Sequence, residues 1–337
     1  MTMQFSIFVF CMGSSFLFLI IRAGNYFKNN MSASVFFLLG ILLIVFAVFR
    51  PSSLPDYSQY YKFFNHQDKV LEYRIELGSR IFRFFSNSFK VFLLWHAAFA
   101  ILIKFFSIKQ FSKLPILSVI SYIATSYSLH DLIQIRISCA IGIFLVAVNF
   151  LAKKKIFNYF VMILLAALFH KSAIVFFIFC FLGIKRYNHF FYSLLILIAY
   201  GMASVNFGII KLFEILLPAK SYYFMSILEN NTFTTIDIFN FEQLLSLMVF
   251  FLVSPNIRRI NNRLLSIYMK VFAISIIVIP FFSSVSLVAA RFSEMLRPAI
   301  IFVLPYVVYS LKNKSIGYAI FLVFCFCYSV LNNFWYL

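Results

Sequence analysis

The chain has 337 residues, of which 63% are hydrophobic and only 12% are charged, and its mean hydropathy is +0.96. A soluble domain of this size needs a polar surface that such a composition cannot supply. The net charge of +19 is scattered over many short segments. This scatter favours anionic lipid or phosphate as the partner and excludes nucleic acid from our expectations.

Apolar blocks separated by short basic clusters run along the whole chain. They predict an all-α, polytopic integral membrane protein, because a helix satisfies its own backbone hydrogen bonds in lipid. We expect about twelve transmembrane helices in one membrane domain, residues 1–337, with the first block kept as a span and not removed as a signal peptide. The spans are expected near residues 5–21, 31–49, 89–108, 114–129, 137–152, 156–169, 172–184, 190–207, 241–254, 264–282, 298–311 and 316–331.

The charges in the connections predict the orientation. Alternate connections carry only basic residues, namely Arg22, Lys28, Lys109, Lys113, Lys153, Lys154, Lys155, Lys185, Arg186, Arg258, Arg259, Arg263, Lys312 and Lys314. By the positive-inside rule these connections face the cytoplasm, so both termini lie outside. All ten acidic residues fall in the other connections or at their helix edges. The outer connections include two long loops, at about residues 50–88 and 208–240.

The same alternation predicts a short helical hairpin at 156–184. Lys153–Lys155 and Lys185–Arg186 belong on one side, so the chain must reverse between them, at His170 and Lys171. The 15 residues from Lys155 to His170 make about 22 Å of helix, less than the hydrocarbon thickness. We therefore expect His170 in a cavity below the outer surface, although it could simply end a helix.

Candidate site residues collect in the predicted outer connections. They are Arg50, Asp56, Tyr60, Glu76, Asp131, Arg136, His170, Lys171, Tyr222, Arg291 and Arg297. Arginine suits phosphate because its guanidinium group donates paired hydrogen bonds and stays positively charged. Histidine or a carboxylate can accept a proton from a sugar hydroxyl. Neither a metal-ligand spacing nor a nucleotide loop is present, and the five cysteines fall inside apolar blocks, so no cofactor, metal or disulfide is predicted.

Structural interpretations of the same residues remain open. Arg50 could extend to lipid phosphate, and the tyrosines could form an interfacial belt. Asp131 with Arg136, and Glu294 with Arg291 or Arg297, could be structural ion pairs.

Three segments resemble the bacterial polysaccharide polymerases of the Wzy O-antigen type, and in particular the EpsG-like branch. They are RPSSLPDYSQYYKFF with ELGSRIF, the stretch from IQIRISCAIGIF to LFHKSAIVFF, and RFSEMLRPAIIFVLPYV. The most specific part is Arg136 followed by small residues, a lysine cluster and Phe169–Ala173. The resemblance covers roughly residues 45–310. Where that branch often has glycine before the loop aspartate, this chain has Leu54-Pro55-Asp56, which makes any role of Asp56 less secure.

The resemblance implies a membrane glycosyltransferase of the bacterial cytoplasmic (inner) membrane, and the missing metal-ligand spacing predicts that it is metal-independent. A growing O-antigen, capsule or exopolysaccharide chain is transferred from undecaprenyl pyrophosphate to a lipid-linked repeat unit on the outer face. A chain-length regulator and a flippase are the implied protein partners. In this scheme Arg136 and Arg291, supported by Arg50 and Arg297, bind the pyrophosphate. His170 is the first choice of base, with Asp131 or Asp56 second.

Two other functions compete with the polymerase. A flippase for the lipid-linked oligosaccharide also needs a cationic cavity, but usually has inverted repeats, and no repeat is evident. A membrane acyltransferase that modifies the glycan would need a histidine near a cytosolic donor, and His189 alone supports it.

Overall fold

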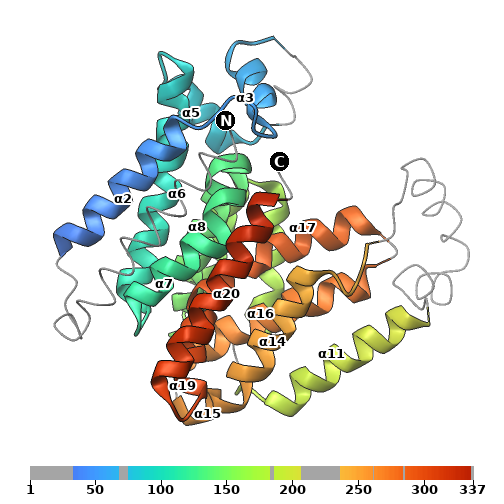
Figure 1. Cartoon of the computed structure of the whole chain (residues 1–337). Coiled ribbons are helices and arrows are strands. Elements are labelled where there is room, and N and C mark those ends of the chain that lie inside the picture. The colour runs from blue at the N-terminus through green and yellow to red at the C-terminus, as the bar shows by residue number, and fades with distance from the viewer. Residues whose placement is uncertain are drawn as a thin grey trace, which may run out of the picture. The chain divides into compact units, whose positions relative to one another are not determined.

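A computed structural model describes residues 33–67, 75–182, 186–205, 236–260, 262–283 and 285–334, and every regular element in those ranges is a helix (Figure 1). The chain forms two compact units, which are described separately. The first unit comprises residues 1–181 with 319–337, and the second comprises residues 182–318. The predicted all-helical membrane protein is therefore confirmed.

The first unit combines long apolar helices, several shorter apolar helices and two short helices of the first outer connection. Helix α6 packs against both α2 and α8, and α8 packs against α9. The elements are α2 (Ala33–Val48), α3 (Tyr57–Phe64), α5 (Leu77–Phe84), α6 (Phe89–Phe111), α7 (Pro115–Tyr122), the π-helix η2 (Ile123–Ile133), α8 (Ile135–Ala152), α9 (Ile156–Ala167), the 3₁₀ helix η3 (Lys171–Ile178) and α10 (Phe179–Leu182).

The second unit is organised around α16, which packs against α11, α14 and α17. Its elements are α11 (His189–Ser204), α14 (Phe241–Val253), η4 (Ser254–Asn256), α15 (Ile257–Ile260), α16 (Arg263–Phe281), α17 (Ser286–Leu296), η5 (Arg297–Ala299), α18 (Ile300–Val303), η6 (Leu304–Tyr306), α19 (Val307–Ser310) and the start of α20 (Lys314–Phe334). The 3₁₀ turns η5 and η6 contain Pro298 and Pro305 near their starts, where proline's missing N–H is tolerated.

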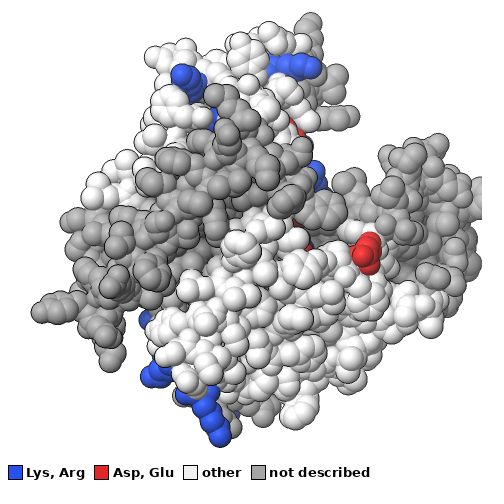
Figure 2. Space-filling view, viewed as in Figure 1, with Lys and Arg blue, Asp and Glu red and all other residues white. Residues whose placement is uncertain are grey.

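The expectation of about twelve spans is not supported. Within the described ranges, six helices are long and apolar enough to cross a membrane: Phe89–Phe111, Pro115–Ile133, Ile135–Ala152, Arg263–Phe281, Val288–Ser310 and Lys314–Asn332. Five apolar helices are shorter: Phe36–Val48, Ile156–Ala167, Lys171–Phe181, His189–Ser204 and Phe241–Asn256. The 12 residues of α9, for example, extend only about 18 Å. The first predicted span lies outside the described residues. On the face in Figure 2, most of the described surface belongs to uncharged residues, as expected for helices that contact lipid.

The predicted reversal at His170 is present. Helix α9 ends at Ala167, His170 has extended backbone angles, and η3 begins at Lys171. The two arms run antiparallel, because the Tyr159 hydroxyl donates to the Phe176 carbonyl at 2.5 Å and the rings of Phe160 and Phe177 lie 4.9 Å apart. The depth of this turn in a membrane stays a prediction.

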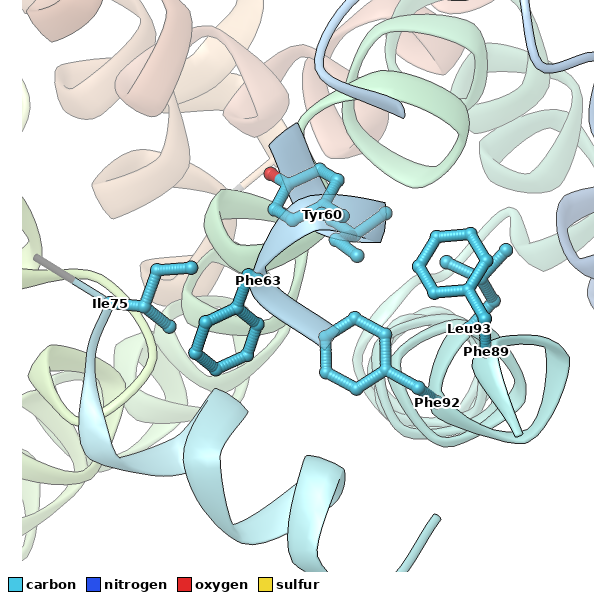
Figure 3. Close-up of a cluster of buried hydrophobic side chains, with 7 residues drawn as sticks. Tyr60, Phe63, Ile75, Phe89, Phe92 and Leu93 are labelled. Atoms are coloured by element: carbon cyan, nitrogen blue, oxygen red, sulfur yellow. The ribbon is translucent and has the colours of Figure 1, made fainter. Parts of the chain in front are cut away.

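The first outer connection folds onto the helices instead of forming an irregular loop. Helix α3 packs on the start of α6 through a buried cluster of Tyr60, Phe63, Ile75, Phe89, Phe92, Leu93 and Ile135 (Figure 3). Helix α5 is fixed against the hairpin turn, since the Gly78 N–H donates to the Leu168 carbonyl at 2.7 Å. A Cβ atom at Gly78 would lie only 2.7 Å from the Phe169 ring, so this contact requires glycine. Most of the second predicted loop, 208–240, lies outside the described residues.

Candidate functional site

The Glu76 carboxylate is the meeting point of three residues that the sequence singles out. Its Oε2 atom accepts a hydrogen bond from Arg136 Nη1 at 2.6 Å, and its Oε1 atom lies 3.6 Å from His170 Nδ1. The Lys171 backbone N–H donates to Oε1 at 3.3 Å, while the Lys171 side chain is exposed. The side chain of Glu76 is 6% exposed, against 24% for Arg136 and 18% for His170. The cluster is thus largely enclosed but still reachable.

Three separate elements bring these side chains together. Glu76 is the residue before α5, Arg136 lies in the first turn of α8, and His170 occupies the turn between α9 and η3. The close approach at Gly78 holds the start of α5 against that turn. The short distances around Glu76 therefore follow from the packing of segments far apart in the sequence.

Tyr60 extends the site toward α3. It is buried in the hydrophobic cluster, and the Arg136 guanidinium carbon lies 5.8 Å from the centre of its ring, within the range of a cation–π contact. Burial raises the pKa of Tyr60, so its hydroxyl stays protonated at neutral pH. Tyr60 can therefore pack on a cation and donate a hydrogen bond at the same site.

Arg50 is a second buried cation in this part of the first unit. It follows α2, is 6% exposed, and donates from Nη1 to the Leu132 carbonyl at 2.6 Å. Its Nε atom is buried without a hydrogen-bond partner, and none of the ion pairs found among the described residues includes Arg50. Burial lowers the pKa of Arg50 from 12.5 to about 10, and nearby tyrosines and the Asp131 carboxylate oppose this effect. A guanidinium with this pKa remains charged at neutral pH.

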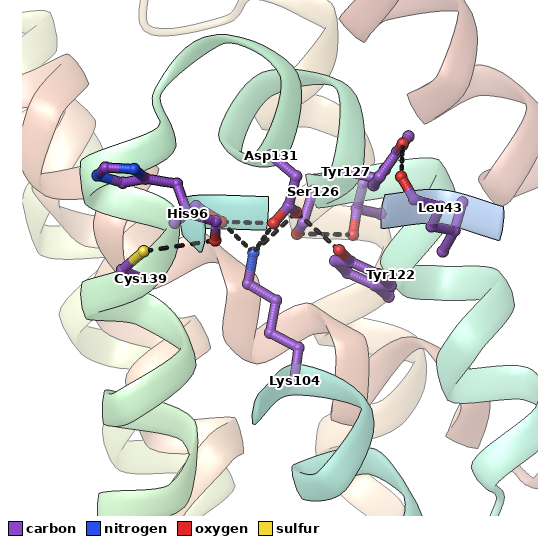
Figure 4. Close-up of polar contacts among 10 residues, drawn as sticks. Leu43, His96, Lys104, Tyr122, Ser126, Tyr127, Asp131 and Cys139 are labelled. Carbon is purple, nitrogen blue, oxygen red and sulfur yellow. Dashed lines mark hydrogen bonds and ion pairs between the residues drawn. The ribbon is translucent and has the colours of Figure 1, made fainter. Parts of the chain in front are cut away.

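Asp131 belongs to a different, fully enclosed cluster (Figure 4). Both of its carboxylate oxygens accept from Lys104 Nζ, at 2.9 and 2.8 Å, and neither side chain is exposed. The hydroxyls of Tyr122 and Ser138 also donate to it, at 2.7 and 2.5 Å. The open interpretation that Asp131 pairs with Arg136 is therefore wrong. Its carboxylate is saturated by protein groups, which leaves Asp131 without the accessible oxygen that a base needs.

Lys104 is a residue that the sequence analysis missed. It lies in the middle of the apolar helix α6, where an unpaired charge is costly and a partner is to be expected. A single lysine within an apolar helix was therefore the sequence signal for a buried ion pair. Its partner in the structure is Asp131.

Asp56 does not join the Glu76 cluster through any contact seen in the described part of the chain. It precedes α3 with a positive φ of 64°, and its side chain does not cap the helix. A non-glycine residue in this left-handed region is uncommon, and aspartate is one of the residues that tolerate it. Its position thus fits a role in the turn before α3.

The remaining predicted cations lie in the second unit. Arg297 pairs with Glu242 of α14 and donates from Nη2 to Ser293 Oγ at 3.1 Å. Arg291 is half exposed and lies 3.5 Å from Glu294 one turn along α17. Glu242 is a partner that the sequence analysis missed, whereas the pairing of Glu294 with Arg291 is one that it left open. Tyr222 lies outside the described residues.

No group of three or more histidine, cysteine, aspartate or glutamate side chains suited to a metal ion occurs in the described ranges. Cys139, Cys180, Cys325 and Cys327 are free thiols there, and the first three are buried. The candidate site in the first unit is accordingly one of guanidinium, imidazole, phenol and carboxylate groups.

Comparison with known proteins gives a family for nearly the whole chain. The family model described as the EpsG family matches residues 34–337. No curated protein and no solved structure matches the chain. The matched range includes the whole of the Glu76 cluster.

Proposed function

This chain belongs to the EpsG family, and we propose that it is a polysaccharide polymerase acting on lipid-linked glycans. The proposed donor is a growing glycan on undecaprenyl pyrophosphate, and the proposed acceptor is a lipid-linked repeat unit on the outer face of the bacterial cytoplasmic membrane. The product would be an O-antigen, capsule or exopolysaccharide.

The observation that carries this proposal is an excess of positive charge around Tyr60, which lies close enough to both Arg136 and Arg50 to interact with their charges. Arg136 and Arg50 are two permanent cations, and Glu76 is the carboxylate paired with one of them. Arg50 is bonded to a backbone carbonyl and has a buried, unsatisfied Nε atom. Burying a charge without a counter-ion is costly, so this arrangement favours an anionic ligand. Pyrophosphate offers the oxygens that guanidinium groups bind best.

The proposed reaction is a single group transfer. The bond between the anomeric carbon of the donor glycan and the pyrophosphate oxygen breaks, and a bond from that carbon to the acceptor hydroxyl oxygen forms. The hydroxyl proton passes to His170, and undecaprenyl pyrophosphate leaves with the released electron pair. Arg136 and Arg50 stabilise the charge that grows on the leaving group.

In this scheme Glu76 interacts with both the base, His170, and the cation that binds the leaving group, Arg136. Its Oε1 atom lies 3.6 Å from His170 Nδ1, close enough for its charge to stabilise the imidazolium formed when the proton arrives. Its Oε2 atom fixes Arg136. Because Glu76 contacts both residues, it fixes the distance between His170, which accepts the proton, and Arg136, which binds the leaving group.

Helix lengths support a site below the outer membrane surface. If Lys153–Lys155 marks the cytoplasmic boundary, Arg136 lies 17 residues of α8 away, about 25 Å, and the end of α9 before His170 lies about 18 Å away. Both lengths fall short of a hydrocarbon core of about 30 Å. Polar groups at that depth are compatible with an aqueous cavity that opens outward.

Arg291 and Arg297 belong to the second unit, and a role for them in pyrophosphate binding stays a prediction. Of the two, Arg291 is the more accessible, and Arg297 is already paired with Glu242.

The proposal can be tested in a strain that lacks the gene, by expressing variants and profiling the length of the surface polysaccharide. Arg136→Gln, Arg50→Gln and His170→Ala should each remove long chains, and loss of one charge-stabilising donor should slow turnover by roughly 10²–10³-fold. Lys153→Gln removes an exposed positive charge outside the site and should leave chain length unchanged. Normal long chains from all three site variants, at normal protein levels, would refute the assignment.

The same strains separate a polymerase from a flippase. A polymerase defect should leave single repeat units accessible at the outer face, whereas a flippase defect should trap them on the cytoplasmic side. An acyltransferase defect should change neither chain length nor sidedness, only the acyl content of the glycan.

A further inference from the structure

The buried Lys104–Asp131 pair lies next to a cation of the proposed site, within the first unit. Asp131 is followed by Leu132, whose carbonyl accepts a hydrogen bond from Arg50 Nη1 at 2.6 Å. The negative charge of Asp131 also acts on the Arg50 guanidinium and partly opposes the effect of burial on the Arg50 pKa. The proposed reaction uses Arg50 and gives no task to Lys104 or Asp131.

The negative charge of Asp131 is balanced inside its own cluster. Lys104 Nζ donates to the two carboxylate oxygens at 2.9 and 2.8 Å and to Ser138 Oγ at 2.6 Å. Tyr122 adds a hydrogen bond to the carboxylate at 2.7 Å, and Figure 4 shows the Lys104 and Tyr122 side chains converging on Asp131. Neither member of the ion pair is exposed. In this arrangement Asp131 already has a counter-ion and does not need Arg50 as one.

Loss of the Lys104 charge would change the state of Arg50. A buried carboxylate without a counter-charge is costly, so it favours contact with another cation. Arg50 is bonded to the peptide group next to Asp131, and its Nε atom is buried without a hydrogen-bond partner. Its guanidinium could therefore take the place of the lysine. A guanidinium paired with a carboxylate attracts a further anion much less.

A structural role alone does not account for a charge at position 104. A buried ion pair often contributes no more stability than apolar side chains of similar volume. Lys104 lies in the apolar helix α6, and charged side chains inside membrane helices are rare and usually functional. A function for this lysine must act through the groups that it touches, because it is fully buried.

We propose that Lys104 is a positioning residue of the pyrophosphate site, and that its pairing with Asp131 keeps this carboxylate from neutralising Arg50. The inference rests on the proposed function. Lys104 does not touch the substrate in this scheme. It acts through Asp131 on Arg50, which stays positively charged and open to the pyrophosphate.

The test measures the binding of inorganic pyrophosphate to the full-length protein in nanodiscs of neutral lipid, by isothermal titration calorimetry. Lys104→Gln keeps an N–H donor for Asp131 and removes the positive charge. It should weaken pyrophosphate binding about tenfold, because an uncompensated carboxylate then opposes the anion. Lys109→Gln removes an exposed lysine from the same helix and should leave binding unchanged.

Asp131→Asn gives a result that distinguishes this role from a structural one. It removes the competing carboxylate, so pyrophosphate should bind at least as tightly as it does to the wild-type protein. The double variant with Lys104→Gln and Asp131→Asn contains neither charge and should also bind like the wild type. A purely structural pair would instead make both single variants bind more weakly, since each of them breaks the same contact.

Three results would overturn the proposal: unchanged binding by Lys104→Gln, equal losses from the two single variants, or weak binding by the double variant. The double variant decides the matter if a single variant does not fold, because no unpaired charge is left in it. Arg50→Gln separates the two proposals. Wild-type pyrophosphate affinity in Arg50→Gln would contradict the proposed function, whereas weak binding by Arg50→Gln together with normal binding by Lys104→Gln would contradict only the role of Lys104.

Discussion

Removing one member of the buried Lys104–Asp131 pair should destabilise the first unit strongly. Lys104→Met leaves the Asp131 carboxylate with only the hydroxyls of Tyr122 and Ser138, in a site where neither member of the pair is exposed. Breaking such a pair from one side typically costs about 3–5 kcal/mol, because a buried charge is left without its counter-charge. Asp131→Asn should cost a similar amount, since it strands the ammonium group.

The double variant distinguishes a charge effect from a packing effect. With Lys104→Met and Asp131→Asn together no buried charge remains, and the asparagine oxygen can still accept from a hydroxyl. We expect the double variant to lose no more than about 1–2 kcal/mol, which is less than either single variant. The coupling energy would then be favourable by more than 2 kcal/mol, as for residues in direct contact.

Equilibrium unfolding of the purified protein in mixed micelles, titrated with sodium dodecyl sulfate, measures these free energies. Lys90→Met, which removes an exposed lysine from the same helix together with its cation–π contact to Phe49, is the control and should change stability by less than about 1 kcal/mol. The reasoning would be refuted if each single variant cost less than about 1 kcal/mol, or if the two single effects simply added.

Three further predictions concern the close contact at Gly78, the Tyr60–Arg136 contact and the Arg297–Glu242 ion pair. Gly78→Ala should lower the free energy of unfolding by about 1–3 kcal/mol and reduce activity, because the new methyl group would collide with the Phe169 ring. Gly201→Ala is the control in the same unfolding titration. It should be neutral or stabilising, because no atom lies within 4 Å of the added carbon. Tyr60→Phe keeps the ring beside Arg136 and should retain more polymerase activity than Tyr60→Leu in the chain-length profile; equal losses would contradict the cation–π contact. Arg297→Gln and Glu242→Gln should each destabilise the protein, and their combination should be less than additive, whereas simple additivity would contradict the ion pair.

Sequence reasoning predicted the elements of this fold better than their lengths. The apolar blocks and the charge alternation located most helices and the reversal at His170, because hydropathy and loop charge are local properties. Whether a block forms a full crossing depends on where packing ends the helix. The 12-residue α9 stops at Ala167, since the turn there is fixed by the contacts of Leu168 and Phe169 with Gly78 on another segment.

The sequence indicated which residues belong to the candidate site more readily than which of them contact one another. Arg136, His170 and Glu76 were all chosen from the sequence, yet Arg136 lies 60 positions from its partner Glu76 and Lys171 lies 95 positions away. Periodicity reports which face of one helix a residue occupies and carries no information about which distant helix packs on that face. Lys104 escaped notice for a related reason, because its role becomes visible only when Asp131 is seen opposite it.

The comparison of Asp131 with Glu76 shows how packing selects between two acidic residues that the sequence left as candidates. Both lie next to the end of a helix and both accept from a basic side chain. Asp131 is matched by one lysine and two hydroxyls in a site with no exposure, so its charge is already neutralised and it can gain little from a ligand. Glu76 faces a partly exposed arginine and a histidine, and Arg50 in the same unit has no ion-pair partner among the described residues. The unbalanced charge, and not acidity as such, is therefore the property that favours the Glu76 cluster as the ligand site.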